Sequence, residues 1–119
     1  MIQILTVKDP LEQRKLCQKA GLIFSEDHHI IAIHNETGVI EMGAIFKYQN
    51  DFGEILWLDM GEDVDLADGL ARSILSIMEI RGVKKVTLPL KYETLARKLN
   101  FQLVDDYYEV NLEGYFYGQ

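Results

Sequence analysis

Five carboxylates lie within ten consecutive positions of this sequence, and no basic residue lies among them. They are Asp59, Glu62, Asp63, Asp65 and Asp68. They border a segment with helical periodicity, and an aspartate at a helix start accepts hydrogen bonds from the first backbone amides. We therefore expect Asp65 to cap this helix and Asp68 to interact with the helix dipole in place of a bound anion.

The same acids do not form a calcium loop, because their spacing differs from that of an EF-hand. Counting from Asp63, the twelfth position, which needs glutamate, is occupied by Ile74. His28, His29 and His34 are also poor metal ligands: six residues of strand between His28 and His34 span roughly 20 Å, and no cysteine or close carboxylate joins them. Strand-end histidines exposed to solvent explain them better, and we expect no metal site.

Small residues follow the acids in the stretch Leu66-Ala67-Asp68-Gly69-Leu70-Ala71. Unpaired amides at a helix start favour an anion, and glycine permits close approach to the backbone. Neighbouring carboxylates oppose such binding, because two like charges about 4 Å apart repel by about 4 kcal/mol at an effective dielectric constant near 20. The stretch therefore combines an anion-binding pattern with charges that weaken it.

Composition narrows the functional classes. The chain has 119 residues, enough for one domain, with a net charge of -7 and a pI near 4.8. Its basic residues are scattered, which argues against nucleic acid as a partner. A single cysteine, Cys17, excludes an internal disulfide, and no segment has the ~20 apolar residues that cross a bilayer. We expect a cytoplasmic protein without membrane association.

Hydrophobic periodicity predicts the elements that position these residues. Strands are expected at residues 2–7, 29–34, 39–48, 54–60 and 83–90, with two more between 101 and 117. Helices are expected from Pro10 to Gly21, at residues 66–81 and at residues 92–99. The strand-helix-strand order of residues 54–90 predicts two parallel strands that splay apart, with the helix packed between them.

This order of elements resembles the GNAT N-acetyltransferases from about residue 30 to residue 101. The best local matches are Arg81-Gly82-Val83-Lys84-Lys85-Val86 at a helix end and Leu99-Asn100-Phe101 in place of the family's Leu-Gly-Phe. The resemblance implies an α/β (α+β) fold of the acyl-CoA N-acyltransferase type, with a mixed, mostly antiparallel sheet flanked by helices. Residues 1–119 would form a single such domain.

The resemblance also implies a site for acetyl-CoA or another acyl-CoA. GNAT enzymes bind the pyrophosphate with the motif Gln/Arg-x-x-Gly-x-Gly/Ala, to which Gly69 and Ala71 conform, whereas Leu66 replaces the Gln/Arg. The cofactor-binding residues implied by the match are Leu58, Met60, Gly69, Leu70, Ala71 and Arg72.

Two catalytic residues follow from the same resemblance. Glu54 stands where some GNAT enzymes carry a base for the ammonium of the acceptor. Leu95 and Ala96 stand where the family has Phe-Tyr, so the usual acid is missing, and Tyr92, one helical turn earlier, is its candidate substitute. The alternative role of Tyr92 is packing of the helix on the sheet.

Two functions are compatible with this pattern. The first is an N-acyltransferase, weakened in its cofactor loop, that acts on a small-molecule or protein amine. The second is a non-catalytic GNAT-fold module for binding or assembly that has lost CoA binding. Aromatic residues in the tail, namely Tyr107, Tyr108, Tyr115, Phe116 and Tyr117, further predict a homodimer formed through the C-terminal strands.

Overall fold

The computed structural model describes residues 3–116, which form one seven-stranded sheet of order β1-β2-β3-β4-β5-β7-β6. The strands are β1 (Gln3–Thr6), β2 (His29–His34), β3 (Ile40–Gln49), β4 (Phe52–Leu58), β5 (Lys85–Pro89), β6 (Gln102–Val104) and β7 (Tyr107–Asn111). The helices are α1 (Pro10–Ala20), α2 (Val64–Ile80) and α3 (Glu93–Lys98), the last preceded by the short 3-10 helix η1 (Leu90–Tyr92). The predicted mixed, mostly antiparallel sheet flanked by helices is confirmed.

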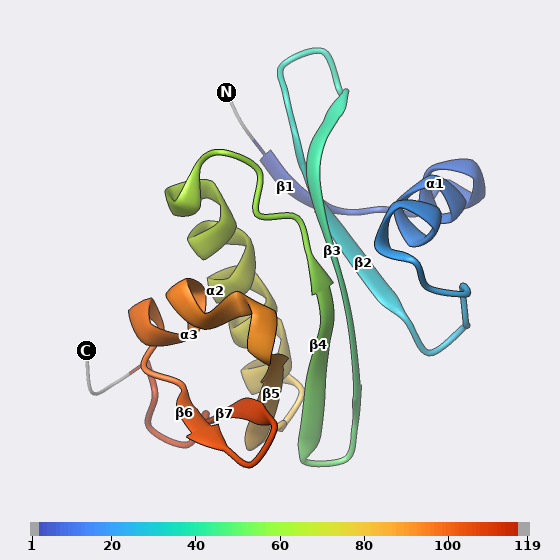
Figure 1. Ribbon diagram of the computed structural model, residues 1–119. Helices are drawn as coiled ribbons and strands as arrows, with labels where there is room; N and C mark the ends of the chain where they lie inside the picture. The colour runs from blue at the N-terminus through green and yellow to red at the C-terminus, as the bar shows by residue number, and fades with distance from the viewer. Residues whose placement is uncertain (1–2, 117–119) are drawn as a thin grey trace.

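Two hydrophobic cores lie on opposite faces of the sheet, one under α2 and α3 and the other under α1 (Figure 1). Residues of β2 alternate between them, because successive side chains of a strand point to opposite faces. Ile31 and Ile33 pack on the α2 side, whereas Ile30 and Ala32 pack on the α1 side. None of the helices in residues 3–116 has the length and apolar character needed to cross a membrane.

Side-chain caps and left-handed residues fix the helix ends. Asp9 caps α1, and Gly21, at φ 73°, ends it as predicted. Asp63, and not Asp65, caps α2: its carboxylate accepts hydrogen bonds from the amides of Asp65 and Leu66. The predicted cap was wrong because helical conformation already begins at Val64, so that Asp65 is the second residue of the helix.

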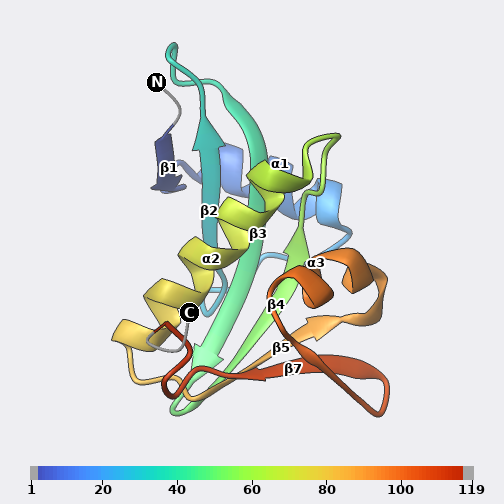
Figure 2. The same ribbon diagram turned by 90° about the vertical axis from the view of Figure 1, so that its left-hand side faces the viewer.

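A bulge in β4 separates it from β5. Ile55 pairs with Phe46 of β3 and Trp57 pairs with Ile45, so Leu56 is an extra residue on β4. Such a residue bends a strand and increases its twist. Parallel pairing with β5 is accordingly limited to residues 52–54, and beyond them the strands diverge, with α3 beside the opening (Figure 2). The predicted parallel, splayed pair is confirmed.

The tail differs from its prediction after Asn111, where β7 ends. Tyr115 lies in a turn, is buried, and donates a hydrogen bond of 2.9 Å from its hydroxyl to the carbonyl of Leu99. Tyr115 therefore packs the end of α3 and does not belong to an exposed strand. Its ring meets Phe116 edge to face, and Tyr117 lies outside the described residues. The homodimer stays a prediction.

We expect Gly53→Ala to destabilise the protein by about 1–3 kcal/mol, the usual cost of overpacking. A Cβ on Gly53 would lie 2.5 Å from the sulfur of buried Met78, where α2 packs against β4. Gly69→Ala is the matched control, because no atom lies within 4 Å of its added Cβ. Alanine should stabilise α2 there by up to about 1 kcal/mol. Urea denaturation measures both, and a Gly53→Ala variant as stable as wild type would refute the close contact.

Candidate functional site

The divergence of β4 and β5 leaves a hollow of about 340 Å³ beside the last residues of β4. It is lined by Lys19, Trp57, Leu58, Asp59, Met60, Lys91 and Tyr92. Three residues implied by the sequence, Leu58, Met60 and Tyr92, thus come together although Tyr92 is more than thirty residues away in the chain. We call this hollow the splay pocket.

Tyr92 bridges the opening between the strands. Its ring is buried at 3% exposure, and its hydroxyl oxygen accepts a hydrogen bond of 2.8 Å from the backbone amide of Leu58. The next amide along β4, that of Asp59, points the other way and donates to Gly43 of β3. The phenol therefore satisfies an amide that β5 no longer reaches, and its own proton is not used in that bond. The packing role predicted for Tyr92 is confirmed.

Charged groups surround the mouth of the splay pocket. Lys19 of α1 contacts Asp59 at 2.7 Å, which ties the helix to the end of β4. The ammonium of Lys91 lies 5.2 Å from the centre of the Tyr92 ring, within cation–π range. The pocket therefore combines an apolar wall with two lysines and one carboxylate.

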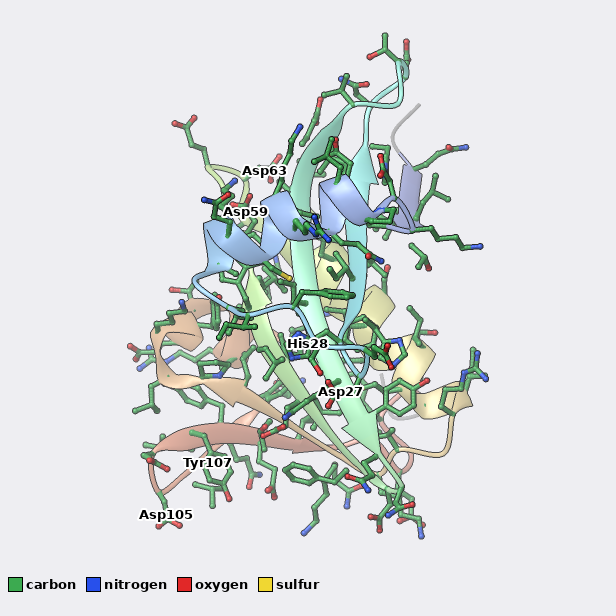
Figure 3. The ribbon with its side chains drawn as sticks, turned by 90° about the vertical axis from the view of Figure 1, so that its right-hand side faces the viewer. Asp27, His28, Asp59, Asp63, Asp105 and Tyr107 are labelled. Carbon is green, nitrogen blue, oxygen red and sulfur yellow. The ribbon has the colours of Figure 1, made fainter. Side chains whose placement is uncertain are left out.

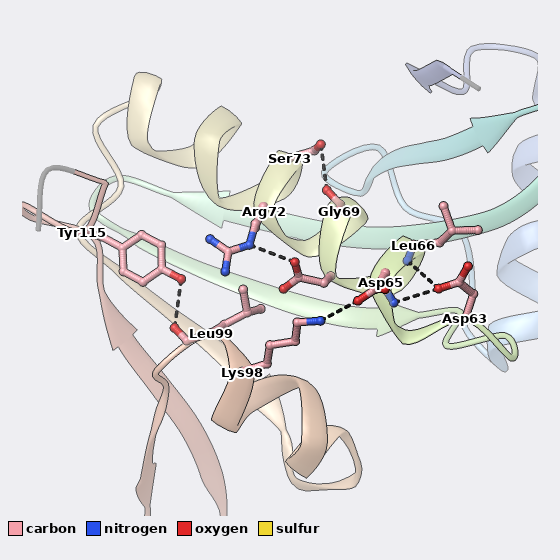
Figure 4. Close-up of polar contacts among 10 residues, drawn as sticks. Asp63, Asp65, Leu66, Gly69, Arg72, Ser73, Lys98, Leu99 and Tyr115 are labelled. Carbon is pink, nitrogen blue, oxygen red and sulfur yellow. Dashed lines mark hydrogen bonds and ion pairs between the residues drawn. The ribbon is translucent and has the colours of Figure 1, made fainter. Parts of the chain in front are cut away.

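The acidic side chains at the start of α2 are paired with backbone amides of the helix, with Arg72 and with Lys98 of α3 (Figure 4). Asp65 accepts a hydrogen bond of 2.7 Å from Lys98 of α3, and Asp68 pairs with Arg72 at 3.0 Å. The hydrogen bond and charge of Lys98 hold the pKa of Asp65 below its usual value, and Asp65 in turn raises the pKa of Lys98. The three aspartates predicted to repel a bound phosphate are thus already paired: Asp65 and Asp68 with cations, and Asp63 with backbone amides of α2.

The implied phosphate-binding residues lie inside α2. A helix beginning at residue 66, as predicted, would have Asp68 in its first turn; because the helix begins at Val64, Asp68 is its fifth residue and lies beyond that turn. Gly69, Leu70 and Ala71 follow in the helix interior, where backbone amides are bonded within the helix. The side chains of Leu70 and Ala71 point into the core, and neither they nor Arg72 line the splay pocket.

Glu54 lies on the other face of the sheet, in a groove of about 400 Å³. The groove is lined by Phe52, Glu54, Ile55, Leu56, Thr87, Leu88, Pro89, Asp106 and Tyr107. Phe52, Glu54 and Leu56 are alternate residues of β4, and no helix covers this part of the sheet (Figure 3). The Glu54 carboxylate lies 3.5 Å from the ammonium of Lys47 and is 37% exposed. We call this hollow the β-face groove.

His28 differs from its predicted exposure. Its side chain is 11% exposed, in the loop before β2, and its Nδ1 has no hydrogen-bond partner. Asp27 beside it is exposed, and a hydrogen bond from Ser25 lowers its pKa. Across the described range of 3–116, no group of three His, Cys, Asp or Glu side chains is arranged to hold a metal ion.

Comparison with solved structures identifies the architecture. A GNAT-family acetyltransferase from Staphylococcus aureus superposes with a TM-score of 0.70 at 9% identity, covering 94% of this chain and 99% of the other. The ribosomal-protein-S18-alanine N-acetyltransferase of Escherichia coli gives 0.70 at 13% identity, with 94% of each chain covered. An Escherichia coli GNAT N-acetyltransferase in complex with CoA gives 0.68 at 11% identity, covering 98% and 85%. This chain has the GNAT fold.

At sequence level the likeness to GNAT proteins is weak. No protein-family model matches the sequence, and no curated protein matches it. At sequence identities near 10%, the superpositions show only that this chain and the solved acetyltransferases share a fold. The chemistry of this GNAT-fold protein must therefore be argued from its own residues.

The sequence did not predict the two lysines that pair with acids far from them in the chain. Lys98 pairs with Asp65 across 33 positions, and Lys19 pairs with Asp59 across 40. No local spacing connects such partners, because only the packing of α3 and α1 brings them together. The position of Lys91 could have been predicted, since it directly precedes Tyr92 in the sequence and so had to lie near the same pocket.

We expect Tyr92→Phe to lower the free energy of unfolding by about 1–3 kcal/mol, because the buried amide of Leu58 would lose its acceptor. Tyr48→Phe is the matched control: its half-buried ring stacks on His29, and its loss of a hydroxyl should cost less than about 0.5 kcal/mol. Equilibrium denaturation compares the two. Equal stability of Tyr92→Phe and wild type would mean that the hydroxyl does not bridge the strands.

Proposed function

We propose that this protein is an acyl-CoA-dependent N-acyltransferase that moves an acetyl or other acyl group to an amine. The observation that supports this most is the splay pocket, where β4 and β5 part and a buried phenol meets a strand amide. GNAT-fold neighbours include an Escherichia coli N-acetyltransferase in complex with CoA. In the proposed reaction the amine nitrogen bonds to the thioester carbonyl carbon, and the sulfur leaves with the bonding electron pair.

Tyr92 is the proposed acid. The leaving thiolate needs a proton, and the phenol can supply it because its oxygen accepts from Leu58 while its hydrogen is unused. Leu58 and Met60 are the proposed neighbours of the acyl arm, since both line the splay pocket. If the Leu58 amide transfers its hydrogen bond from the Tyr92 oxygen to the thioester carbonyl oxygen, it also stabilises the negative charge that develops there.

Glu54 is the proposed base. The attacking amine must lose a proton, and a carboxylate is suited to receive it when an ammonium lies within hydrogen-bond reach. Glu54 stands on the same strand as Leu58, four residues earlier, and opens into the β-face groove. Base and acid thus lie in different hollows that both border the diverging part of β4, so the amine and the acyl group would have to meet at the opening between β4 and β5.

Of the four residues implied to contact CoA on α2, Gly69 and Arg72 are the proposed contacts, because Leu70 and Ala71 are fully buried in the core. The backbone amides of these residues are bonded within the helix, so they cannot bind phosphate directly. Gly69 leaves open space for a ligand, because no atom of a neighbouring side chain lies within 4 Å of the position of a Cβ. Arg72 and Lys98 are the nearby cations, held by Asp68 and Asp65. Phosphate oxygens would have to replace these carboxylates, which predicts weak binding that falls as salt rises.

A specific observation favours the alternative, a non-catalytic GNAT-fold module for binding or assembly. Asp63 already accepts hydrogen bonds from two amides at the start of α2, and Lys98 is engaged by Asp65. A helix start that satisfies its own donors needs no phosphate. The two functions therefore differ in whether acyl-CoA competes successfully with these internal contacts.

We expect acetyl-CoA to raise the melting temperature in low salt. A ligand at 100 times its Kd stabilises the folded state by about 2.7 kcal/mol, which corresponds to roughly 10 °C for a domain of this size. Differential scanning calorimetry over a range of acetyl-CoA concentrations measures the shift. The absence of any shift at millimolar acetyl-CoA would contradict the proposed activity and support the non-catalytic module.

One variant distinguishes a loss of catalysis from a loss of acetyl-CoA binding. Glu54→Gln should keep the shift in melting temperature and lower the rate of acyl transfer by about 10²–10⁴-fold, the usual contribution of a general base. Glu113→Gln, an exposed glutamate in the C-terminal turn, should change neither. Unchanged turnover in Glu54→Gln would exclude the proposed base while leaving the CoA site intact.

A further inference from the structure

Among the described residues 3–116, Asp59 is the one carboxylate that lines the splay pocket, and it follows directly after β4. Its side chain is only 15% exposed and accepts two hydrogen bonds. One oxygen accepts from the ammonium of Lys19 at 2.7 Å, and the other accepts from the backbone amide of Gly61 at 3.2 Å. Because both oxygens are engaged, this carboxylate holds neighbouring groups in place and does not serve as a free base.

The contact with Gly61 fixes the residue that lies between the two partners. The amide of Asp59 donates to the carbonyl of Gly43 in β3 at 2.9 Å, and Gly61 turns the chain with a left-handed φ of 54°. Met60 is thus held by the strand contact before it and by the Asp59 carboxylate after it. Its side chain lines the splay pocket and packs against the core under α2. The position of this pocket wall therefore depends on Asp59.

The contact with Lys19 restrains the end of α1. Lys19 belongs to the last turn of the helix and itself lines the splay pocket, and Figure 3 shows Asp59 beside this end of α1. Trp57 is 8% exposed, packs in the core under α1 and also lines the pocket. The ion pair therefore keeps the helix end next to the pocket wall that Trp57 forms.

We infer that Asp59 is a positioning residue for acyl transfer: its carboxylate holds Met60 and the end of α1 in place as walls of the splay pocket. This inference rests on the proposed function, in which the acyl arm enters that pocket. A pocket whose side chains are already ordered loses less conformational entropy when a ligand binds. Loss of these contacts should weaken acyl-CoA binding and leave the chemical step unchanged, because Glu54 and Tyr92 keep their own partners.

Three variants separate the two contacts of Asp59. Lys19→Met removes the ion pair alone. Asp59→Asn removes the same ion pair but keeps an oxygen for the Gly61 amide, and Asp59→Ala removes both contacts. Lys15→Met is the matched control, because Lys15 lies one turn earlier on α1 and forms an exposed pair with Glu12.

Acrylamide quenching of tryptophan fluorescence follows the pocket walls without any ligand, because Trp57 is the only tryptophan of the chain. Quenching should increase in Lys19→Met and Asp59→Asn, and increase further in Asp59→Ala, as local opening exposes the ring. Lys15→Met should give the quenching of the wild type.

Isothermal titration and steady-state kinetics with acetyl-CoA test the role in the reaction. Lys19→Met and Asp59→Asn should each weaken binding about fivefold, the cost of ordering one more flexible side chain, and Asp59→Ala should weaken it further. KM should rise in parallel while kcat stays within about twofold of the wild type, as expected when uniform binding is lost. Lys19→Arg should restore the affinity by renewing the ion pair.

The outcomes separate the inference from the proposed function. Unchanged quenching in Lys19→Met and Asp59→Asn, or affinities equal to that of Lys15→Met, overturns the positioning role even if the wild type transfers acyl groups. A fall in kcat with KM unchanged also overturns it, and equal effects of Asp59→Asn and Asp59→Ala overturn the part that concerns Met60. Increased quenching in the variants of a protein that binds no acetyl-CoA overturns the proposed function and, with it, the role of Asp59 in acyl transfer.

Discussion

The separation of β4 from β5 is the constraint on which the rest of the site depends. Leu56 is one residue too many for the pairing of β4 with β3, so β4 bends and keeps only three pairs with β5. The amide of Leu58 is left without a strand partner, and a buried amide needs an acceptor. Tyr92 provides it from the start of the α3 region. The splay pocket exists because one bulge redirects one strand.

The two faces of the sheet differ in how far their acidic side chains are paired with cations or amides. On the α2 side, Asp63, Asp65 and Asp68 are engaged with amides, Lys98 and Arg72, so the helix start presents little free positive potential to an anion. On the open side, Asp106 and Glu109 have no such partners within residues 3–116. The described surface therefore attracts a cation on the open side more readily than an anion at the start of α2, and weak CoA binding is expected for this reason.

Much of the fold could be predicted from the sequence, because its signals are local. Alternation in residues 29–34, the apolar face of α2 and the left-handed Gly82 and Asn100 are all properties of short segments. The start of α2 was missed by two residues because several aspartates compete for one cap, and only the structure shows that Asp63 is used. The alternation predicts strands throughout residues 101–117, but Tyr115 lies in a turn and bonds to Leu99, a contact that no periodicity encodes. Glu54 and Tyr92 could be named from a resemblance, but their placement in separate hollows follows from the bend in β4.

The most direct test of this account is a titration of the isotopically labelled protein followed through its backbone amide resonances, with acetyl-CoA compared against CoA. If the acyl group enters the splay pocket, the Leu58 amide must exchange its bond to Tyr92 for a new environment. We expect a shift of the Leu58 resonance with acetyl-CoA that is larger than the shift with CoA, which lacks the acyl carbonyl. Binding of acetyl-CoA with no change at Leu58, or with the same change for both ligands, would contradict the placement of the reaction at the divergence of β4 and β5.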